Sequence, residues 1–214
     1  MKKRDAFTLI EVLIAVMLSA YIAAAMAVIY STASRHMFQD YRSNIIKGNV
    51  GVAMRAIGNA MTQATRIDAP NLGFTGNILA VAANVDQRTG CYPVMPGVAV
   101  TLHYFCTAAS PDGSLGLFYQ TASPALKPGC TCPSLTAPVG CAIVYPACGG
   151  TQLASHIDTT VPLFSRAAAL PDYINDAMSV RVNIRSIWNP AVFGTTQRKV
   201  DFTLTSTFAV SSSQ

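Results

Sequence analysis

The chain has 214 residues, of which 51% are hydrophobic and 12% are charged, and its formal net charge is +5 at pH 7. This length suffices for one ordinary domain with a buried core, and the apolar content excludes an intrinsically disordered chain. The net charge is small and scattered, unlike the basic footprint of a dedicated nucleic-acid-binding protein. Six cysteines in a chain with few charges favour an oxidising compartment.

The hydrophobic residues are concentrated near the N-terminus. In the range 7–30, 21 of 24 residues are apolar, and the three exceptions are Thr8, Glu11 and Ser19. As a helix this segment would be about 36 Å long, which is enough to cross a bilayer. The basic stretch Lys2-Lys3-Arg4 precedes it. We therefore expect a cytoplasmic N-terminus and export of the rest of the chain.

Glu11 is the one acid in this apolar segment. A carboxylate in hydrocarbon costs about 2.5–3.5 kcal/mol on insertion scales, so it needs a partner or a proton. No basic residue lies between positions 7 and 30, so the partner must come from elsewhere. Two alternatives stay open: a protonated glutamate near the helix end, and a secretory signal peptide cleaved at small residues around 23–27. An acid within the apolar region argues against the signal peptide.

Residues 3–12, with the sequence KRDAFTLIEV, closely resemble the class III signal of type IV prepilins and type II secretion pseudopilins. The shared order is basic residues, a small residue, Phe, a short and mostly apolar run, and Glu. The resemblance implies that a prepilin peptidase cleaves between Ala6 and Phe7 and that the new N-terminus at Phe7 is methylated. It also implies that Glu11 pairs with the terminal ammonium group of a neighbouring subunit during fibre assembly.

Cleavage after Ala6 would create the missing cation at the membrane depth of Glu11, and the pair can also form within one helix before assembly. Family members usually carry Gly at the position of Ala6. Major pilins often carry Gly and Pro in the second half of this helix, whereas the first proline here is Pro70. An unbroken helix suits an accessory subunit better than the main fibre protein.

A helical pattern continues to about Arg66. Apolar residues recur along it at steps of three and four: Ile46, Val50, Ala53, Ile57, Ala60 and Ala64. Gly48, Gly51 and Gly58 each weaken an isolated helix by up to about 1 kcal/mol relative to Ala, so packing must stabilise this part. We expect the apolar stripe to face a sheet; the alternative is a partner helix.

The second half of the chain has the pattern of strands and turns. Residues 98–104 and 115–119 alternate on either side of SPDG at 110–113, which predicts a β-hairpin. Residues 180–184 and 200–210 also alternate and predict two half-buried antiparallel strands. One long helix followed by an antiparallel sheet is an α+β fold in which the helix covers a sheet face. A pilin has this arrangement.

The predicted organisation has four parts: a cleaved cytoplasmic leader at 1–6, a transmembrane and fibre-core helix at 7–30, its amphipathic continuation at 31–66, and an exported β-rich domain at 67–214. Looser patterns at 52–64, 170–174 and 180–184 look like PilW-type minor pilins and are similar to J-type pseudopilins of type II secretion.

All six cysteines lie outside the predicted membrane helix: Cys91, Cys106, Cys130, Cys132, Cys141 and Cys148. Fifteen pairings are possible. We expect disulfides, with Cys91 bonded to Cys106 and the two cysteines at 130 and 132 bonded to those at 141 and 148. A zinc site is the alternative, because four thiols fall within nineteen residues. The CxC spacing argues against it, since structural zinc sites favour CxxC, so we expect no metal.

No catalytic constellation is evident. The histidines at positions 36, 103 and 156 are isolated, and neither GxSxG nor a phosphate-binding loop occurs. We therefore expect neither catalysis nor a cofactor. Four basic residues near the last two strands form a solvated face or, alternatively, contact DNA or an anionic surface: Arg181, Arg185, Arg198 and Lys199. The lack of interleaved aromatic residues disfavours a nucleic-acid partner.

The resemblance implies a minor type IV pilin, a structural subunit that helps to initiate or stabilise a filament for motility, adhesion or DNA uptake. The implied partners are other pilin subunits, the prepilin peptidase and the inner-membrane assembly machinery. The implied location is the inner membrane, followed by the periplasm or a surface pilus. The alternatives are a minor pseudopilin of a type II secretion system, a DNA-uptake pilin, and a tip adhesin that uses a disulfide-stapled region at 124–150.

Overall fold

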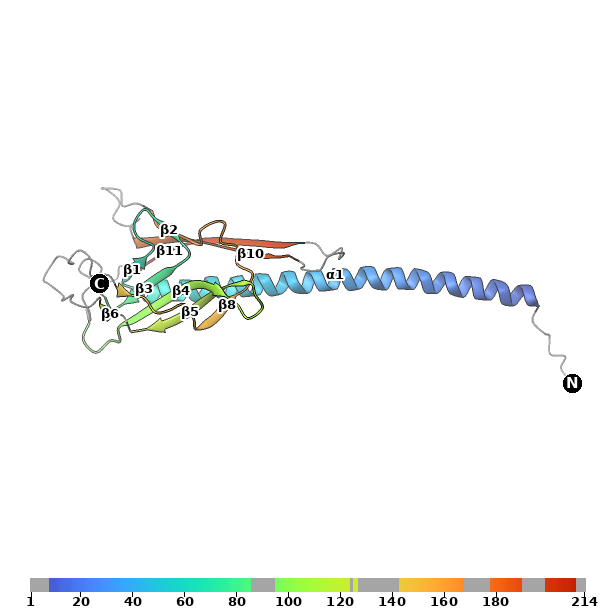
Figure 1. Ribbon diagram of the computed structural model, residues 1–214, viewed down its shortest axis with the longest axis horizontal. Coiled ribbons are helices and arrows are strands. Elements are labelled where there is room, and N and C mark those ends of the chain that lie inside the picture. The colour runs from blue at the N-terminus through green and yellow to red at the C-terminus, as the bar shows by residue number, and fades with distance from the viewer. Residues whose placement is uncertain are drawn as a thin grey trace.

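The computed structural model describes residues 8–85, 95–123, 125–126, 143–167, 178–189 and 199–210. Within these residues one α-helix, α1 (Leu9–Gln63), carries a β-rich head at its C-terminal half, while its N-terminal half projects freely (Figure 1). The 55 residues of α1 span about 82 Å. The predicted single long helix is confirmed.

The helix ends at Gln63, three residues before the position that the pattern predicts. Ala64 is already extended, with φ −75° and ψ 145°. Thr65 then bonds to the sheet: its N–H donates to the Ala82 carbonyl (2.8 Å) and its hydroxyl to the Val85 carbonyl (2.7 Å). The chain leaves the helix there and pairs with Ala82 of a neighbouring strand and with Val85 just after that strand.

In the described part of the chain, the head contains three antiparallel sheets. The first has the order β1-β3-β4-β5-β8, with bounds Arg66–Ala69, Leu79–Ala83, Thr101–Ala109, Leu115–Ala122 and Thr151–Ala154. The second has the order β11-β10-β9-β2, with bounds Val200–Ala209, Ser179–Trp188, Phe164–Ser165 and Thr75–Gly76. The third pairs β6 (Ala125–Leu126) with β7 (Ile143–Val144).

The head half of α1 lies between the first two sheets (Figure 1). Its buried side chains are the predicted stripe, which Met54 and Met61 widen as the sequence indicates: Ile46, Val50, Ala53, Met54, Ile57, Ala60 and Met61. Ala64, the last residue of the predicted stripe, is also buried but lies just after the helix. The same core contains Phe105 and Leu117 from the first sheet and Val182 and Ile184 from the second. The stripe therefore faces two sheets, where the sequence suggested one.

Both predicted strand pairs are confirmed. β4 and β5 form a hairpin, closed by the Ser110 N–H donating to the Ser114 carbonyl (2.7 Å), with Gly113 at φ 79°. β10 and β11 pair along their full lengths, from Ser179 opposite Ala209 to Trp188 opposite Val200. β4 differs from the expected alternation, since residues 102–106 are all buried. Its second face packs in a separate apolar cluster with residues of β3.

Segment 156–158 connects the two large sheets. The Ile157 N–H donates to the Leu115 carbonyl at the start of β5 (2.8 Å), and the Asp158 N–H donates to the Arg185 carbonyl on β10 (2.8 Å). His156 is in the left-handed region at φ 59° and its carbonyl accepts from the Ile187 N–H (2.7 Å). The two sheets and α1 thus form one α+β head.

Candidate functional site

The free half of α1 carries the residue that the sequence singled out. Glu11 lies in the first helical turn, where the N–H groups of Glu11 and Val12 donate to the Thr8 carbonyl (3.0 and 3.3 Å). Thr8 is the N-cap residue but its side chain makes no capping bond. A carboxylate at this end of a helix interacts favourably with the helix dipole.

Several predicted site residues lie outside the part of the chain that the structure describes. They are the processing residues Ala6 and Phe7, the cysteines Cys91, Cys130, Cys132 and Cys141, and Arg198. The processing of Ala6 and Phe7, disulfide formation by these four cysteines and the surface role of Arg198 therefore remain predictions.

Glu11 lines a shallow groove on the helix surface. Small side chains are among its lining residues: Ala15, Ser19 and Ala20, beside Val12 and Val16. The Ser19 hydroxyl donates to the Ala15 carbonyl (2.8 Å), so its polar atom is paired within the helix. Glu11 is the one ionisable residue of this groove. Small residues allow the backbone of another helix to approach closely, and the carboxylate offers that neighbour a charge.

The surface around Glu11 is apolar and uncovered. Every residue from Leu9 to Ala33 is exposed, and large side chains such as Leu9 and Tyr21 are 85% and 76% exposed. An 18-residue window of α1 has a mean hydropathy of 2.6, so by length and composition this helix could cross a membrane. An apolar surface of this size must be buried in lipid or against other protein chains.

A disulfide joins Cys106 on β4 to Cys148, with the Cα atoms 5.8 Å apart. The predicted pairing of Cys106 with Cys91 is therefore wrong, as is the pairing of Cys148 with the cysteines at 130 and 132. Segment 145–148 lies close to β4, because Cys148 is bonded to Cys106. The Gln120 side-chain amide also holds this segment by donating to the Ala147 carbonyl (2.6 Å). Spacing along the sequence could not indicate this approach.

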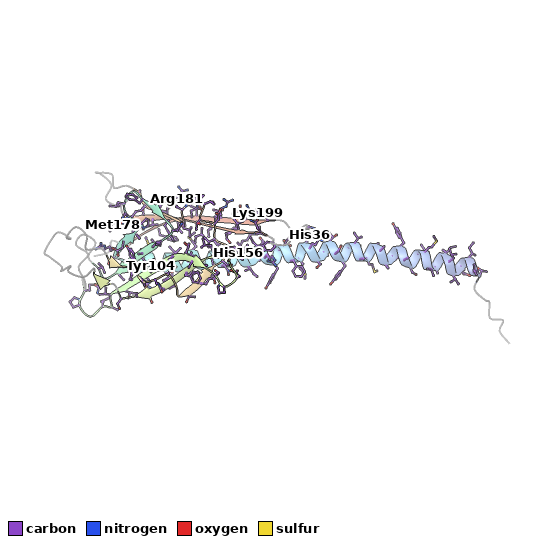
Figure 2. The ribbon with its side chains drawn as sticks, viewed as in Figure 1. His36, Tyr104, His156, Met178, Arg181 and Lys199 are labelled. Carbon is purple, nitrogen blue, oxygen red and sulfur yellow. A yellow bond between two sulfur atoms is a disulfide. The ribbon has the colours of Figure 1, made fainter. Side chains whose placement is uncertain are left out.

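The histidines occupy separate places. His103 is buried on β4, where its Nδ1 lies 2.9 Å from the Tyr119 hydroxyl, and burial lowers its pKa. His156 lies at the head and His36 on α1 just beyond it (Figure 2). Across the described ranges, no three His, Cys, Asp or Glu side chains gather into a possible metal site.

The basic residues of the last two strands do not form one cluster. Arg185 forms ion pairs with Asp158 (3.1 Å) and Asp201, and Lys199 lies 3.8 Å from the same Asp201 carboxylate. Hydrogen bonding from Arg185 lowers the pKa of Asp201. Arg181 is exposed near the opposite end of this sheet from Lys199 (Figure 2). Asp158 and Asp201 thus balance the positive charges of Arg185 and Lys199.

An apolar helix with an acid in its first turn, carried by an α+β head, is the architecture of a pilin-like subunit. Residues 1–27 match the family model described as the prokaryotic N-terminal methylation motif. This match supports membership of the type IV pilin and pseudopilin family. It implies processing by prepilin peptidase and assembly with pilin subunits. No curated protein and no solved structure gave a significant match.

Proposed function

We propose that this protein is a minor type IV pilin, of the PilW type, that helps to initiate or stabilise a pilus. In this proposal the N-terminus faces the cytoplasm and the head is exported before the subunit leaves the inner membrane. The chain acts as a structural subunit and not as an enzyme. The inner-membrane assembly machinery is its proposed partner in this step.

The observation that carries this proposal is the unbroken free half of α1. No Gly or Pro occurs between Leu9 and Lys47, and the helix is continuous through Gln63. Pro and Gly are the residues that destabilise a helix interior most, and this segment contains neither. Its sequence therefore offers no position at which the helix would readily unwind. A helix that stays intact suits an accessory position better than the repeated packing of a main fibre subunit.

Glu11 supplies the proposed assembly chemistry. An uncompensated carboxylate in hydrocarbon costs about 2.5–3.5 kcal/mol on insertion scales. A terminal ammonium group at Phe7 of a neighbouring subunit would offset that cost, because opposite charges attract strongly in a medium of low dielectric constant. The groove of small residues beside Glu11 lets the neighbouring helix come close enough to form the pair.

The first test is the intact mass of the chain purified from membranes. A chain that begins with methylated Phe7 supports the proposal. A chain that still begins at Met1, or that begins near Val28, would remove its basis.

The second test is the variant Glu11→Val, with Val16→Ala in the same groove as the uncharged control. We expect Glu11→Val to remain in the membrane fraction and to be lost from sheared filaments, whereas Val16→Ala enters them. Normal incorporation of Glu11→Val would refute the charge pair.

The third test is deletion of the gene, which should lower the number of pili. A loss of secreted protein with normal pili would instead identify a pseudopilin.

A further inference from the structure

In the part of the chain that the structure describes, one side of the β11 backbone is unpaired. Its sheet has the order β11-β10-β9-β2, so β11 is an edge strand (Figure 1). It has ten residues and pairs with β10 along its full length without a bulge or a shift of register. The free side of such a strand presents N–H and C=O groups with which another strand can form a hydrogen-bonded ladder.

The hydrogen bonds of β10 show which backbone groups of β11 point to the free side. Asn183 of β10 lies opposite Thr205 of β11, but its N–H donates to the Leu163 carbonyl (2.7 Å), on the β9 side of β10. Asn183 and Thr205 therefore form a non-hydrogen-bonded pair, whose backbone groups point away from each other. This orientation recurs at every second residue of an antiparallel strand. The residues whose N–H and C=O groups reach the free side are Asp201, Thr203, Thr205, Thr207 and Ala209.

The apolar side chains of β11 are incompletely covered at this edge. On β10, the inward side chains of Val180 and Ile184 are fully buried. Their cross-strand neighbours on the same inner face, Phe208 and Leu204, are only half-buried, as is Phe202. These three side chains pack against the core of the head and keep part of their apolar surface in contact with solvent. A further strand on the free side of β11 would cover that surface.

The other sheet edges among the described residues are short or irregular. β1 and β8, the edges of the first sheet, have four residues each, and each shifts its register against its neighbour. β2, β6 and β7 have two residues each. Short strands, bulges, charges and prolines are the devices that protect sheet edges from other chains. From Phe202 to Ala209, β11 has none of them, and the charge of Asp201 before this stretch is paired with Arg185.

β11 runs in the same direction as α1. Near the start of β11, the Arg42 guanidinium of α1 lies over the ring of Trp188, which is opposite the first residue of the strand. Near its end, Phe208 lies beside Gly58 of α1. Lys199, which precedes β11, accordingly lies toward the free half of α1 (Figure 2). Subunits anchored in one membrane with their N-termini on the same side have parallel α1 helices, so their β11 strands are parallel as well.

This common direction argues against β11 of a second copy as the partner. Antiparallel pairing of two β11 strands would require one of the two helices to be inverted in the membrane. Parallel pairing suits strands that are buried on both faces, whereas the outward side chains of β11 are all exposed. The other described edges of a second copy are too short or irregular for a ladder of this length. The strand that fits is antiparallel to β11 and belongs to a different subunit.

We propose that the free side of β11 binds an extended strand of a different pilin-like subunit, paired antiparallel to it. The proposal rests on the proposed function, because anchoring in one membrane gives the subunits their common direction. Alternate residues of the partner strand are apolar and cover Phe202, Leu204 and Phe208 on the inner face. The residues between them are polar and lie beside the exposed threonines. Since β11 packs on α1, this pairing would continue the contact between the helices of the two subunits into their heads.

The test is hydrogen–deuterium exchange of single amides, measured by mass spectrometry on the full chain in lipid nanodiscs. The chain is reconstituted alone, and then together with each of the other pilin-like subunits of the same cells in turn. Alone, the outward amides of Thr203, Thr205 and Thr207 should exchange fast, whereas those of Leu204 and Ser206, bonded to β10, should exchange slowly. With one of the other subunits present, we expect the outward amides to exchange slowly as well.

A proline at position 203 separates pairing at the free edge from pairing with β10. Thr203→Pro removes one outward N–H and leaves the ladder with β10 complete, so the other subunit should bind about fivefold more weakly, as for the loss of one backbone hydrogen bond. Thr203→Val is the matched control, because it keeps this N–H, and it should bind normally. Trp188 fluorescence during denaturant titration verifies that both variants are folded. The exchange measurement on the unchanged chain does not depend on either variant.

Three outcomes would overturn the proposal. The outward amides exchange slowly in the chain alone, which indicates pairing with a second copy or within the chain; or none of the other subunits slows them; or Thr203→Pro and Thr203→Val, both folded, bind the subunit equally. The assembly chemistry is tested separately. Glu11→Val should still gain protection at β11, and Thr203→Pro should still be methylated at Phe7, so a failure of the proposed function is distinguishable from a failure of the edge pairing.

Discussion

The two halves of α1 are equally regular helices with opposite surroundings. From Leu9 to Ala33 the helix is apolar on nearly every side and exposed throughout. From Ile46 onward the apolar residues form one stripe, and that stripe is buried between two sheets. A helix that is apolar all round needs a surrounding of lipid or protein, whereas an amphipathic helix needs a single packed face. One half of the helix is therefore suited to lipid or to the surfaces of other chains, and the other half to the core of its own head.

The largest expected difference between the halves is in core stability. Ile57 is fully buried in the head, so Ile57→Ala should lower the free energy of unfolding by about 2–5 kcal/mol. Ile29 is 68% exposed on the free half, so Ile29→Ala should leave it nearly unchanged. Denaturant titration followed by the fluorescence of Trp188, the one tryptophan of the chain, measures both. Equal losses would contradict the division of the helix into two halves.

The second expected effect concerns the disulfide. It lies entirely in the head, so Cys106→Ser combined with Cys148→Ser should destabilise the head by about 2–4 kcal/mol. The free half of α1 has no contact with it, and its helical circular dichroism should persist. A loss of helical signal from the free half at the same denaturant concentration would show that the two halves unfold together.

The third prediction is a dependence of head stability on pH. Burial lowers the pKa of His103, so the folded head binds fewer protons than the unfolded chain. Its contribution to stability is full above the unfolded histidine pKa of about 6.5 and is lost as the pH falls through the lower folded value. We expect Trp188-monitored stability to decrease as the pH falls below about 6.5. His103→Gln should reduce this slope, and His36→Gln on the exposed helix is the control.

The smallest expected effects are at two glycines of α1. A Cβ atom at Gly48 would meet nothing within 4 Å, so Gly48→Ala should stabilise the helix by about 0.5–1 kcal/mol. A Cβ atom at Gly58 would lie 3.0 Å from Cε1 of Phe208, so Gly58→Ala should gain less or destabilise. Thermal unfolding of the two variants compares an open position with a packed one. A larger gain at Gly58 would contradict the described packing of β11 against the helix.

Much of the fold could be predicted from periodicity. The apolar stripe from Ile46 to Ala64 and the alternation in β10 and β11 identify elements with one buried face. β3 was missed, because its sequence LAVAA is buried at four of five positions and an apolar run without alternation does not distinguish strand from helix. β1 and β8 were missed as well, since strands of four residues give too short a pattern.

The candidate sites divide in the same way. Glu11 is evident from the sequence, because an acid among apolar neighbours is anomalous wherever the helix lies. The Cys106–Cys148 bond gives no such signal, since its two cysteines are 42 residues apart along the chain.

By itself the sequence determined the prepilin-type N-terminus, the membrane-length helix and the α+β class, because each depends on the order or spacing of nearby residues. Only the tertiary structure decided that α1 lies between two sheets, which cysteine Cys106 bonds, and that Arg185 is neutralised by Asp158 and Asp201. These contacts join residues distant along the chain. Their pairing follows from how the sheets close around the helix, which no local pattern encodes.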